Sequence, residues 1–197
     1  MSITMAQAIN GISFDMPHVS LETNIIGTLN LMEAIRLNAI KPRVLMAGSS
    51  TEYGNTANII QAKLDEEAAL RPISPYGISK VAMENIANLY HHSHGIPTIT
   101  ARLFIHIGVG GTDSMAIHEF CKQIALAEIG MGPTELLHGN LDTSRDMTDA
   151  RDSAPVMISV CEEGIPGEAY NIGSGTTMTI EDLLEIALRN FADYAQS

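Results

Sequence analysis

The stretch that decides the fold runs from residue 77 to residue 104, GISKVAMENIANLYHHSHGIPTITARLF. Its first half repeats apolar residues at helical spacing, and Gly95 and Pro97 then stop a helix near residue 92. The segment 98–104 (TITARLF) is β-rich and apolar, which is typical of a buried strand. Because another short apolar run at 43–48 (RVLMAG) precedes the helix, the pattern predicts two parallel strands joined by a right-handed helical crossover.

The same alternation of strands and helices continues on both sides of this stretch. Residues 21–38 (LETNIIGTLNLMEAIRLN) predict an amphipathic helix. Further along the chain we expect a long loop at 55–75, helices at 114–129 and 149–162, strands at 135–138 and 168–172, and a last helix from Thr179, where Asp182 completes a sequence like a capping box. The alternation predicts an α/β fold around a mainly parallel sheet. Ser49, the turn after Phe104 and residues 173–175 would then face one crevice at the carboxyl ends of the strands.

Composition narrows the class of protein. The 197 residues carry a formal net charge of -12, and the few basic residues are scattered, so nucleic acid is excluded as the expected partner. No run approaches the roughly 20 apolar residues of a membrane span, and the start has no secretory leader pattern, which favours a cytoplasmic protein. Cys121 and Cys161 lie in apolar helical patterns without a partner at metal spacing, so we expect buried free thiols.

Three side chains predict the chemistry. Tyr76 and Lys80 in SPYGISK are one helical turn apart, so one helix face carries both. A lysine ammonium under the phenol oxygen would lower the tyrosine pKa from about 10, so that Tyr76 exchanges a proton near neutral pH. Ser49 ends the apolar run in LMAGSSTEYG and would share that proton or steady the oxygen that it serves. The set predicts proton transfer on a hydroxyl or carbonyl.

A series of segments, in order, resembles the extended short-chain dehydrogenase/reductase family, also called the NAD-dependent epimerase/dehydratase family. They are AQAINGISFDMP, NIIGTLNLMEAIR, GSSTEYG, SPYGISK, RLFIHIGVG, GNLDTSRDMTDARD and YNIGSG. The segment GNLDTSRDMTDARD is similar to enzymes that act on GDP-sugars, namely GDP-mannose 4,6-dehydratase and GDP-6-deoxy-mannose reductase. The resemblance implies a Rossmann-like sheet with flanking helices, a cofactor that is NAD or NADP, and a nucleotide-diphosphate sugar as substrate.

The resemblance also implies a role for individual residues. Tyr76 would be the acid/base, Lys80 would lower its pKa and hold the nicotinamide ribose, and Ser49 would position the substrate oxygen. The cofactor would further contact Ala6, Gln7 and His106, and the substrate would contact Ser50, Thr51, Asn140 and Arg145. An arginine suits the diphosphate because its fork matches phosphate oxygens.

Two departures from the family pattern narrow the reaction. Dehydratases place a glutamate base where this chain has Thr51, and Glu52 next to it would point to the opposite side of an extended backbone. This favours reduction or epimerisation at sugar C4 over dehydration. The family motif FNHIG is FIHIG here, so Ile105 replaces an asparagine that binds substrate. A GDP-mannose 4,6-dehydratase-like or UDP-sugar epimerase activity is kept as an alternative.

The family pattern also implies missing parts. The strand, GxxGxxG turn and helix that hold the cofactor pyrophosphate would precede residue 1, on the order of 60 residues, and the family continues past residue 197. We therefore expect 1–135 to be a partial Rossmann-like domain and 136–197 a partial nucleotide-sugar-binding portion interleaved with it. A second hypothesis follows: a non-catalytic, truncated relative that serves as a dimerising or nucleotide-sugar-binding module. Helices near 21–38 and 77–92 would pair in a homodimer.

Simpler interpretations stand beside these. His106 would otherwise be a core histidine, and Asn140 and Arg145 would belong to a paired surface network with Asp146, Asp149 and Arg151. The cluster of His91, His92 and His94 is more typical of a solvated helix end than of a metal site.

Overall fold

The computed structural model describes residues 2–3, 10–55, 64–111 and 115–194. Contacts divide the chain into two compact units, each described by itself below. Unit 1 comprises Met1–Phe104 and Arg151–Gly173, and unit 2 comprises Ile105–Ala150 and Ser174–Ser197. The chain therefore crosses between the units three times, after residues 104, 150 and 173, and the boundary that we expected after residue 135 lies inside unit 2.

Unit 1 is built on a parallel four-stranded sheet in the order β1-β2-β3-β7. The strands are β1 (Ser2–Ile3), β2 (Val44–Ser49), β3 (Thr98–Leu103) and β7 (Ala169–Ile172). Ser49 lies opposite Leu103, and Leu103 lies opposite Ile172. The carboxyl ends of β2, β3 and β7 therefore meet at one edge, as the sequence predicted for the strands of this unit.

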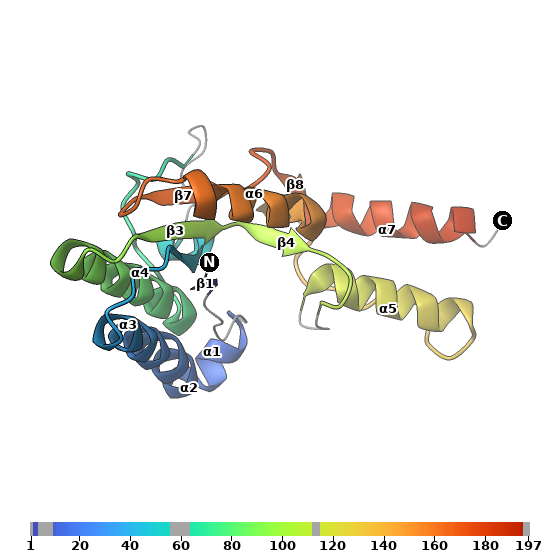
Figure 1. The fold of residues 1–197 in the computed structure, drawn as a ribbon. Coiled ribbons are helices and arrows are strands. Elements are labelled where there is room, and N and C mark those ends of the chain that lie inside the picture. The colour runs from blue at the N-terminus through green and yellow to red at the C-terminus, as the bar shows by residue number, and fades with distance from the viewer. Residues whose placement is uncertain (1, 4–9, 56–63, 112–114, 195–197) are drawn as a thin grey trace. The chain divides into compact units, whose positions relative to one another are not determined.

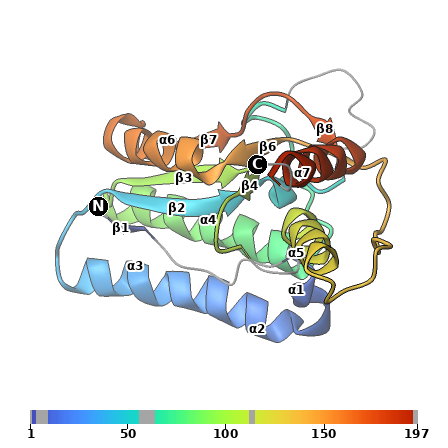
Figure 2. The same ribbon diagram turned by 90° about the vertical axis from the view of Figure 1, so that its right-hand side faces the viewer.

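Helices cover both faces of this sheet, as Figure 2 shows. They are α1 (Ile12–Asp15), α2 (Pro17–Leu21), the π-helix η1 (Glu22–Ile26), α3 (Gly27–Leu37), α4 (Pro75–His94) and α6 (Ala150–Glu163). On one face, Met32 of α3 and Met83 of α4 pack against Met46 of β2. On the other, Cys161 of α6 packs against Leu45 and Ile99. The expected Rossmann-like α/β fold, a mainly parallel sheet with flanking helices, is confirmed.

The sequence explains why α4 begins and ends where it does. The Ser74 hydroxyl accepts the backbone N–H of Gly77 at 3.0 Å, and Pro75 occupies the first turn, where its missing N–H costs nothing. Gly95 ends the helix with φ of 62°, a left-handed conformation that glycine adopts without strain. This exact start places Tyr76 in the first turn of the helix, beside the end of β2.

In its described residues, unit 2 contains two short strand pairs and two helices, which Figure 1 labels. The parallel pair is β4 (Ile105–Ile107) with β6 (Met147–Asp149), the antiparallel pair is β5 (Ser144–Arg145) with β8 (Met178–Thr179), and the helices are α5 (Ala116–Glu128) and α7 (Ile180–Tyr194). Helix α7 starts with the predicted capping box: Thr179 donates its backbone N–H to Asp182 at 2.9 Å, and Asp182 donates its own to Thr179 Oγ1 at 3.0 Å.

The strand that we expected at 135–138 is wrong. These residues lie in an irregular segment, because a side chain of α5 takes the place of a neighbouring strand. Gln123 accepts the backbone N–H of Leu137 at 2.8 Å and donates to its carbonyl at 3.1 Å. The backbone polar groups of Leu137 are thus satisfied without a sheet.

The described residues contain neither a membrane-spanning helix nor a cluster of metal-binding side chains. In that part of the chain, no helix is both long enough and apolar enough to cross a membrane. Nor do the described side chains include a group of three or more His, Cys, Asp or Glu placed to hold a metal ion. Both cysteines are free: Cys161 is buried, as predicted, and Cys121 is half-buried.

Candidate functional site

Ser49 and Tyr76 meet at the carboxyl edge of the sheet in unit 1. Ser49 ends β2, and its hydroxyl oxygen accepts two hydrogen bonds from Thr51, one from the backbone N–H at 3.2 Å and one from the side-chain hydroxyl at 2.9 Å. The Ser49 side chain also lies near enough to the Tyr76 phenol to lower its pKa through hydrogen bonding. Since both lone pairs of the serine oxygen are taken, its own hydrogen is left for the phenol oxygen of Tyr76.

Lys80 lies one turn further along α4, as the spacing predicted, and its side chain approaches the Tyr76 ring. Its ammonium lies 5.4 Å from the centroid of the Tyr76 ring and donates a hydrogen bond to the Ala47 carbonyl at 2.5 Å. Only 2% of Lys80 is exposed. The ammonium therefore faces the ring and the backbone of β2.

The pKa of Tyr76 shifts in the direction opposite to the one that the sequence predicted. Burial raises the pKa of Tyr76 above its ordinary value, and this outweighs the hydrogen bond with Ser49, which lowers it. Burial also lowers the pKa of Lys80 to about 8, while the nearby Glu52 charge opposes that change. At neutral pH the site therefore holds a protonated phenol beside a cation that is close to releasing its proton.

The backbone of Tyr76 is held on both sides by polar side chains that the sequence analysis did not single out. The Ser13 hydroxyl accepts its N–H at 3.2 Å, and the Ser79 hydroxyl donates to its carbonyl at 2.6 Å. Asn24, from the π-helix η1, donates to Ser79 at 2.8 Å. These contacts fix the start of α4 against the first helices of the chain, and no local motif indicated them.

Glu52 is the second correction at this site, because the backbone after Ser49 is not extended. Residues Ser50–Tyr53 form a 3-10 helix, η2, in which Ser49 and Glu52 make a capping box. Glu52 is fully buried and accepts the Ser49 backbone N–H at 2.6 Å. The spacing S-x-x-E was the signal that would have predicted this turn. Thr51 and Ser50 lie in the same turn, where Thr51 supports Ser49 directly.

A buried ion pair lies beside Glu52. Arg102 of β3 binds Glu84 of α4 with two hydrogen bonds, Nε at 3.0 Å and Nη2 at 2.6 Å. The same guanidinium donates to the Tyr53 hydroxyl at 2.8 Å, and Tyr53 donates to Asn171 at 2.7 Å. The network ties η2, α4, β3 and β7 together behind the three predicted catalytic residues.

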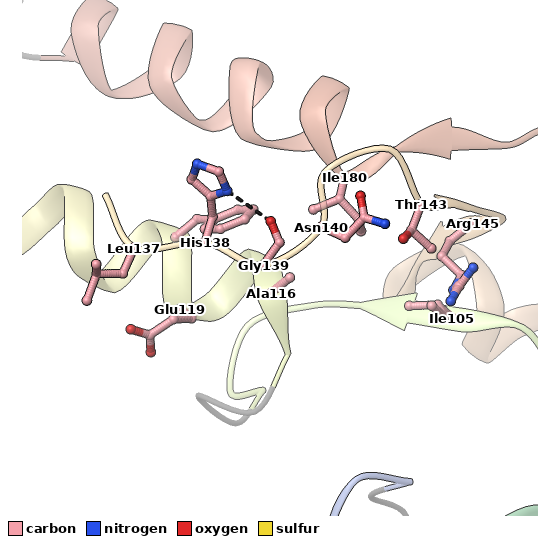
Figure 3. Close-up of a pocket in the computed structure, with 11 residues that line it drawn as sticks. Ile105, Ala116, Glu119, Leu137, His138, Gly139, Asn140, Thr143, Arg145 and Ile180 are labelled. Carbon is pink, nitrogen blue, oxygen red and sulfur yellow. Dashed lines mark hydrogen bonds between the residues drawn. The ribbon is translucent and has the colours of Figure 1, made fainter. Parts of the chain in front are cut away.

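Asn140 and Arg145 line a cavity of about 410 Å³ within unit 2. Figure 3 shows these two side chains with Thr143, and Ile105 near Arg145. The remaining lining residues are Ala116, Glu119, Phe120, Leu137, His138, Gly139 and Ile180. The structure thus brings together the two polar residues that the sequence predicted for a nucleotide, and adds Glu119 and Phe120 of α5, which no motif had indicated.

The polar residues of this cavity are not locked into the surface network that was the simpler interpretation. The Asp146 carboxylate accepts hydrogen bonds from Ser174 and from the N–H of Gly175, each at 2.8 Å. Among the described residues, Arg145 has no ion pair, and its Nη1 donates a hydrogen bond to the Ser144 carbonyl at 2.9 Å. Its guanidinium therefore keeps donors for an anion.

The remaining residues that the sequence singled out lie in other parts of the chain. His106 is half-buried on β4 in unit 2, where burial lowers its pKa and Asp146 opposes this change, so its cofactor contact stays a prediction. Ala6 and Gln7 lie outside the described residues. His91 bonds the Ile96 carbonyl at 3.1 Å at the end of α4, in keeping with a helix-end role.

A parallel α/β sheet with Ser, Tyr and Lys at its carboxyl edge defines the Rossmann-like class of short-chain dehydrogenases/reductases. Residues 5–196 match the family model described as GDP-mannose 4,6 dehydratase, so the chain belongs to that family. The expected family is confirmed.

The chain is similar to individual relatives that are named after GDP-sugars. It is 33% identical over 93% of its length to the GDP-6-deoxy-D-mannose reductase of Pseudomonas aeruginosa, and 30% identical over 92% to a GDP-mannose 4,6-dehydratase of Sinorhizobium fredii. It spans 59% and 51% of those proteins. Among solved structures, RMD from Pseudomonas aeruginosa complexed with NADPH superposes with a TM-score of 0.90 at 32% identity, covering 98% of this chain and 65% of that one.

Proposed function

We propose that this chain carries the proton-transfer site and the nucleotide pocket of an NAD(P)-dependent enzyme that reduces or epimerises C4 of a GDP-sugar. One observation carries the proposal: the Ser49 hydroxyl, with both lone pairs occupied by Thr51, is left to donate to a buried Tyr76 phenol. Such a pair is arranged for an oxygen that gains or loses a proton. The relatives that act on GDP-sugars support the substrate class.

The protonation state of Tyr76 favours the reductive direction. Since burial raises its pKa, the phenol is protonated at neutral pH and acts as an acid. A nicotinamide cofactor, when bound, supplies the hydride to C4. Tyr76 gives its proton to the C4 oxygen as that oxygen gains negative charge, and Ser49 donates a hydrogen bond that steadies the phenolate left behind.

Lys80 fits the role of a cofactor-binding residue. Its ammonium has three N–H donors, and in the described part of the chain one of them is used, on the Ala47 carbonyl. The two others suit the hydroxyls of a nicotinamide ribose. The NADPH complex of the Pseudomonas aeruginosa relative supports a dinucleotide as the cofactor.

The cavity of unit 2 would hold the nucleotide end of the substrate. Arg145 offers a planar guanidinium without an ion-pair partner among the described residues, which suits a diphosphate. Asn140 adds an amide, and Ile105 makes that wall of the cavity apolar where the family motif has an asparagine. Ser50 and Thr51 stay predicted substrate contacts.

The direct test is NADPH oxidation, followed at 340 nm, with a GDP-4-keto-6-deoxyhexose as substrate. We expect turnover that falls on the order of a hundredfold or more in Tyr76→Phe, which keeps the ring and removes the acid. Tyr170→Phe is the matched control, because that hydroxyl bonds the Ile165 N–H away from Tyr76. Equal rates in the two variants would overturn the role of Tyr76.

The second candidate is a nucleotide-sugar-binding module without catalysis. The cavity with Asn140 and Arg145 favours it, since this pocket lies wholly within unit 2. In that case GDP raises the melting temperature, no NADPH is oxidised, and Tyr76→Phe changes nothing measurable. We further propose a homodimer through η1, α3 and α4, whose exposed apolar side chains include Ile26, Leu37, Ile78 and Leu89.

A further inference from the structure

Glu52 is a fully buried ionisable group of unit 1 that the proposed reaction does not use. One carboxylate oxygen accepts the Ser49 backbone N–H at 2.6 Å. The other is buried and makes no hydrogen bond of ordinary geometry to a described residue, although the Glu84 carboxylate lies beside it. A fully buried carboxylate with an oxygen in this position is costly, unless it carries a proton.

The backbone around Glu52 is shaped to bring it close. A Cβ atom at Gly48 would lie 2.7 Å from Glu52 Oε1, so a side chain at position 48 would displace the carboxyl from beneath Ser49. The absence of a side chain at Gly48 therefore leaves room for the Glu52 carboxyl group at the end of strand β2. The Glu52 carboxyl group can lie this close to the backbone of β2 because residue 48 is a glycine.

The charges around Glu52 explain why it retains a proton. Glu84 faces it from α4, but Arg102 of β3 already neutralises Glu84 through two hydrogen bonds. Burial and then repulsion from the Glu84 charge raise the pKa of Glu52 to about 8, although the Arg102 charge lowers it. Lys80 and Tyr76, also on α4, are the remaining groups that feel the Glu52 charge.

We infer that Glu52 is a positioning residue of the Ser49–Tyr76–Lys80 site: it holds Ser49 by the backbone N–H and keeps a proton next to Glu84, so that its ionisation sets the charge beneath Tyr76 and Lys80. The positioning role of Glu52 rests on the proposed function, but the ionisation of Glu52 does not depend on it. When Glu52 is neutral, Lys80 loses its proton more easily. When Glu52 ionises, it favours the charged lysine and the neutral phenol.

The test is carbon NMR of the whole chain labelled in its glutamate carboxyls and lysine ε-carbons. We expect one glutamate signal that titrates near pH 8 and is missing in Glu52→Gln, whose amide oxygen still accepts the Ser49 N–H. If every glutamate carboxyl titrates near the ordinary value of 4.5, the inference is overturned. This first measurement uses the unchanged chain, so it stands even where a variant fails to fold.

The second measurement separates positioning from support of the fold. In Glu52→Gln the Lys80 midpoint should fall below its wild-type value near 8, because a raising charge has been removed. Glu185→Gln, which removes a carboxylate from an exposed ion pair with Arg189, should leave the midpoint unchanged. An unchanged midpoint in Glu52→Gln would contradict the coupling. Neither titration needs cofactor or substrate, so a failure to oxidise NADPH would count against the proposed function alone.

Discussion

The Lys80 ammonium lies 5.4 Å from the centroid of the Tyr76 ring and donates a hydrogen bond to the Ala47 carbonyl. A cation over an aromatic face stabilises the packing of the two side chains. Burial nevertheless holds the pKa of Tyr76 above its ordinary value, so the phenol is protonated at neutral pH. The hydrogen bond with Ser49 acts in the opposite direction and lowers that pKa.

The free energy of unfolding should depend on pH through Glu52. Its folded-state pKa, about 8, is above the ordinary 4.5, so between these values the folded chain binds more protons than the unfolded chain, and stability falls as pH rises. In Glu52→Gln this contribution is lost. Urea unfolding at pH 5, 6.5 and 8 should show the wild type losing stability relative to the variant by about 1 kcal/mol per pH unit. Parallel curves would contradict a raised Glu52 pKa.

Gly77 should tolerate no side chain. A Cβ atom there would lie 2.7 Å from the Thr51 carbonyl and 3.0 Å from Pro72 Cβ, so Gly77→Ala must push α4 away from η2. We expect a loss of about 1–3 kcal/mol in urea unfolding.

Gly27 provides the matched control for this substitution. It opens α3, and a Cβ atom there meets nothing within 4 Å. Gly27→Ala should therefore stabilise the chain by up to about 1 kcal/mol, because alanine loses less entropy in a helix. Similar losses at both positions would show that the clash with Thr51 is not the cause.

Arg145 should determine the affinity for the diphosphate. We expect Arg145→Ala to weaken GDP binding, measured by calorimetry, by roughly tenfold to a hundredfold, as for loss of hydrogen bonds to a charged group. Arg189→Ala removes another arginine, from the exposed pair with Glu185 on α7, and should leave affinity unchanged. Equal affinity in the two variants would place the diphosphate elsewhere.

The oligomeric state should depend on α4. Sedimentation at micromolar concentration should give twice the monomer mass. The double variant Ile78→Lys and Leu89→Lys should give monomers, because the lysine charges would replace exposed apolar side chains and repel each other across a symmetric interface. Leu188→Lys, on exposed α7, should leave the dimer intact. A wild-type monomer would rule out the four-helix interface.

Much of unit 1 was predictable because its signals are local. The period of residues 77–92, the glycine at 95 and the apolar run at 98–104 each act within a few residues, and helix α4 with strands β2 and β3 followed. The short strands β4, β5, β6 and β8 were not predicted. They contain two or three residues each, and their pairing is set by distant segments rather than by a pattern of their own.

By itself, the sequence determined the α/β alternation, the family, and the placement of Ser49, Tyr76 and Lys80 at one strand end, because spacing along a strand or helix dictates which side chains share a face. Only the tertiary structure decided their electrostatics. Burial depends on segments that are far apart in the chain, and it raises the pKa of Tyr76. The fold also places Glu52 next to Glu84, which pairs with Arg102. A pKa responds to desolvation and to every nearby charge, and neither can be read from the order of residues.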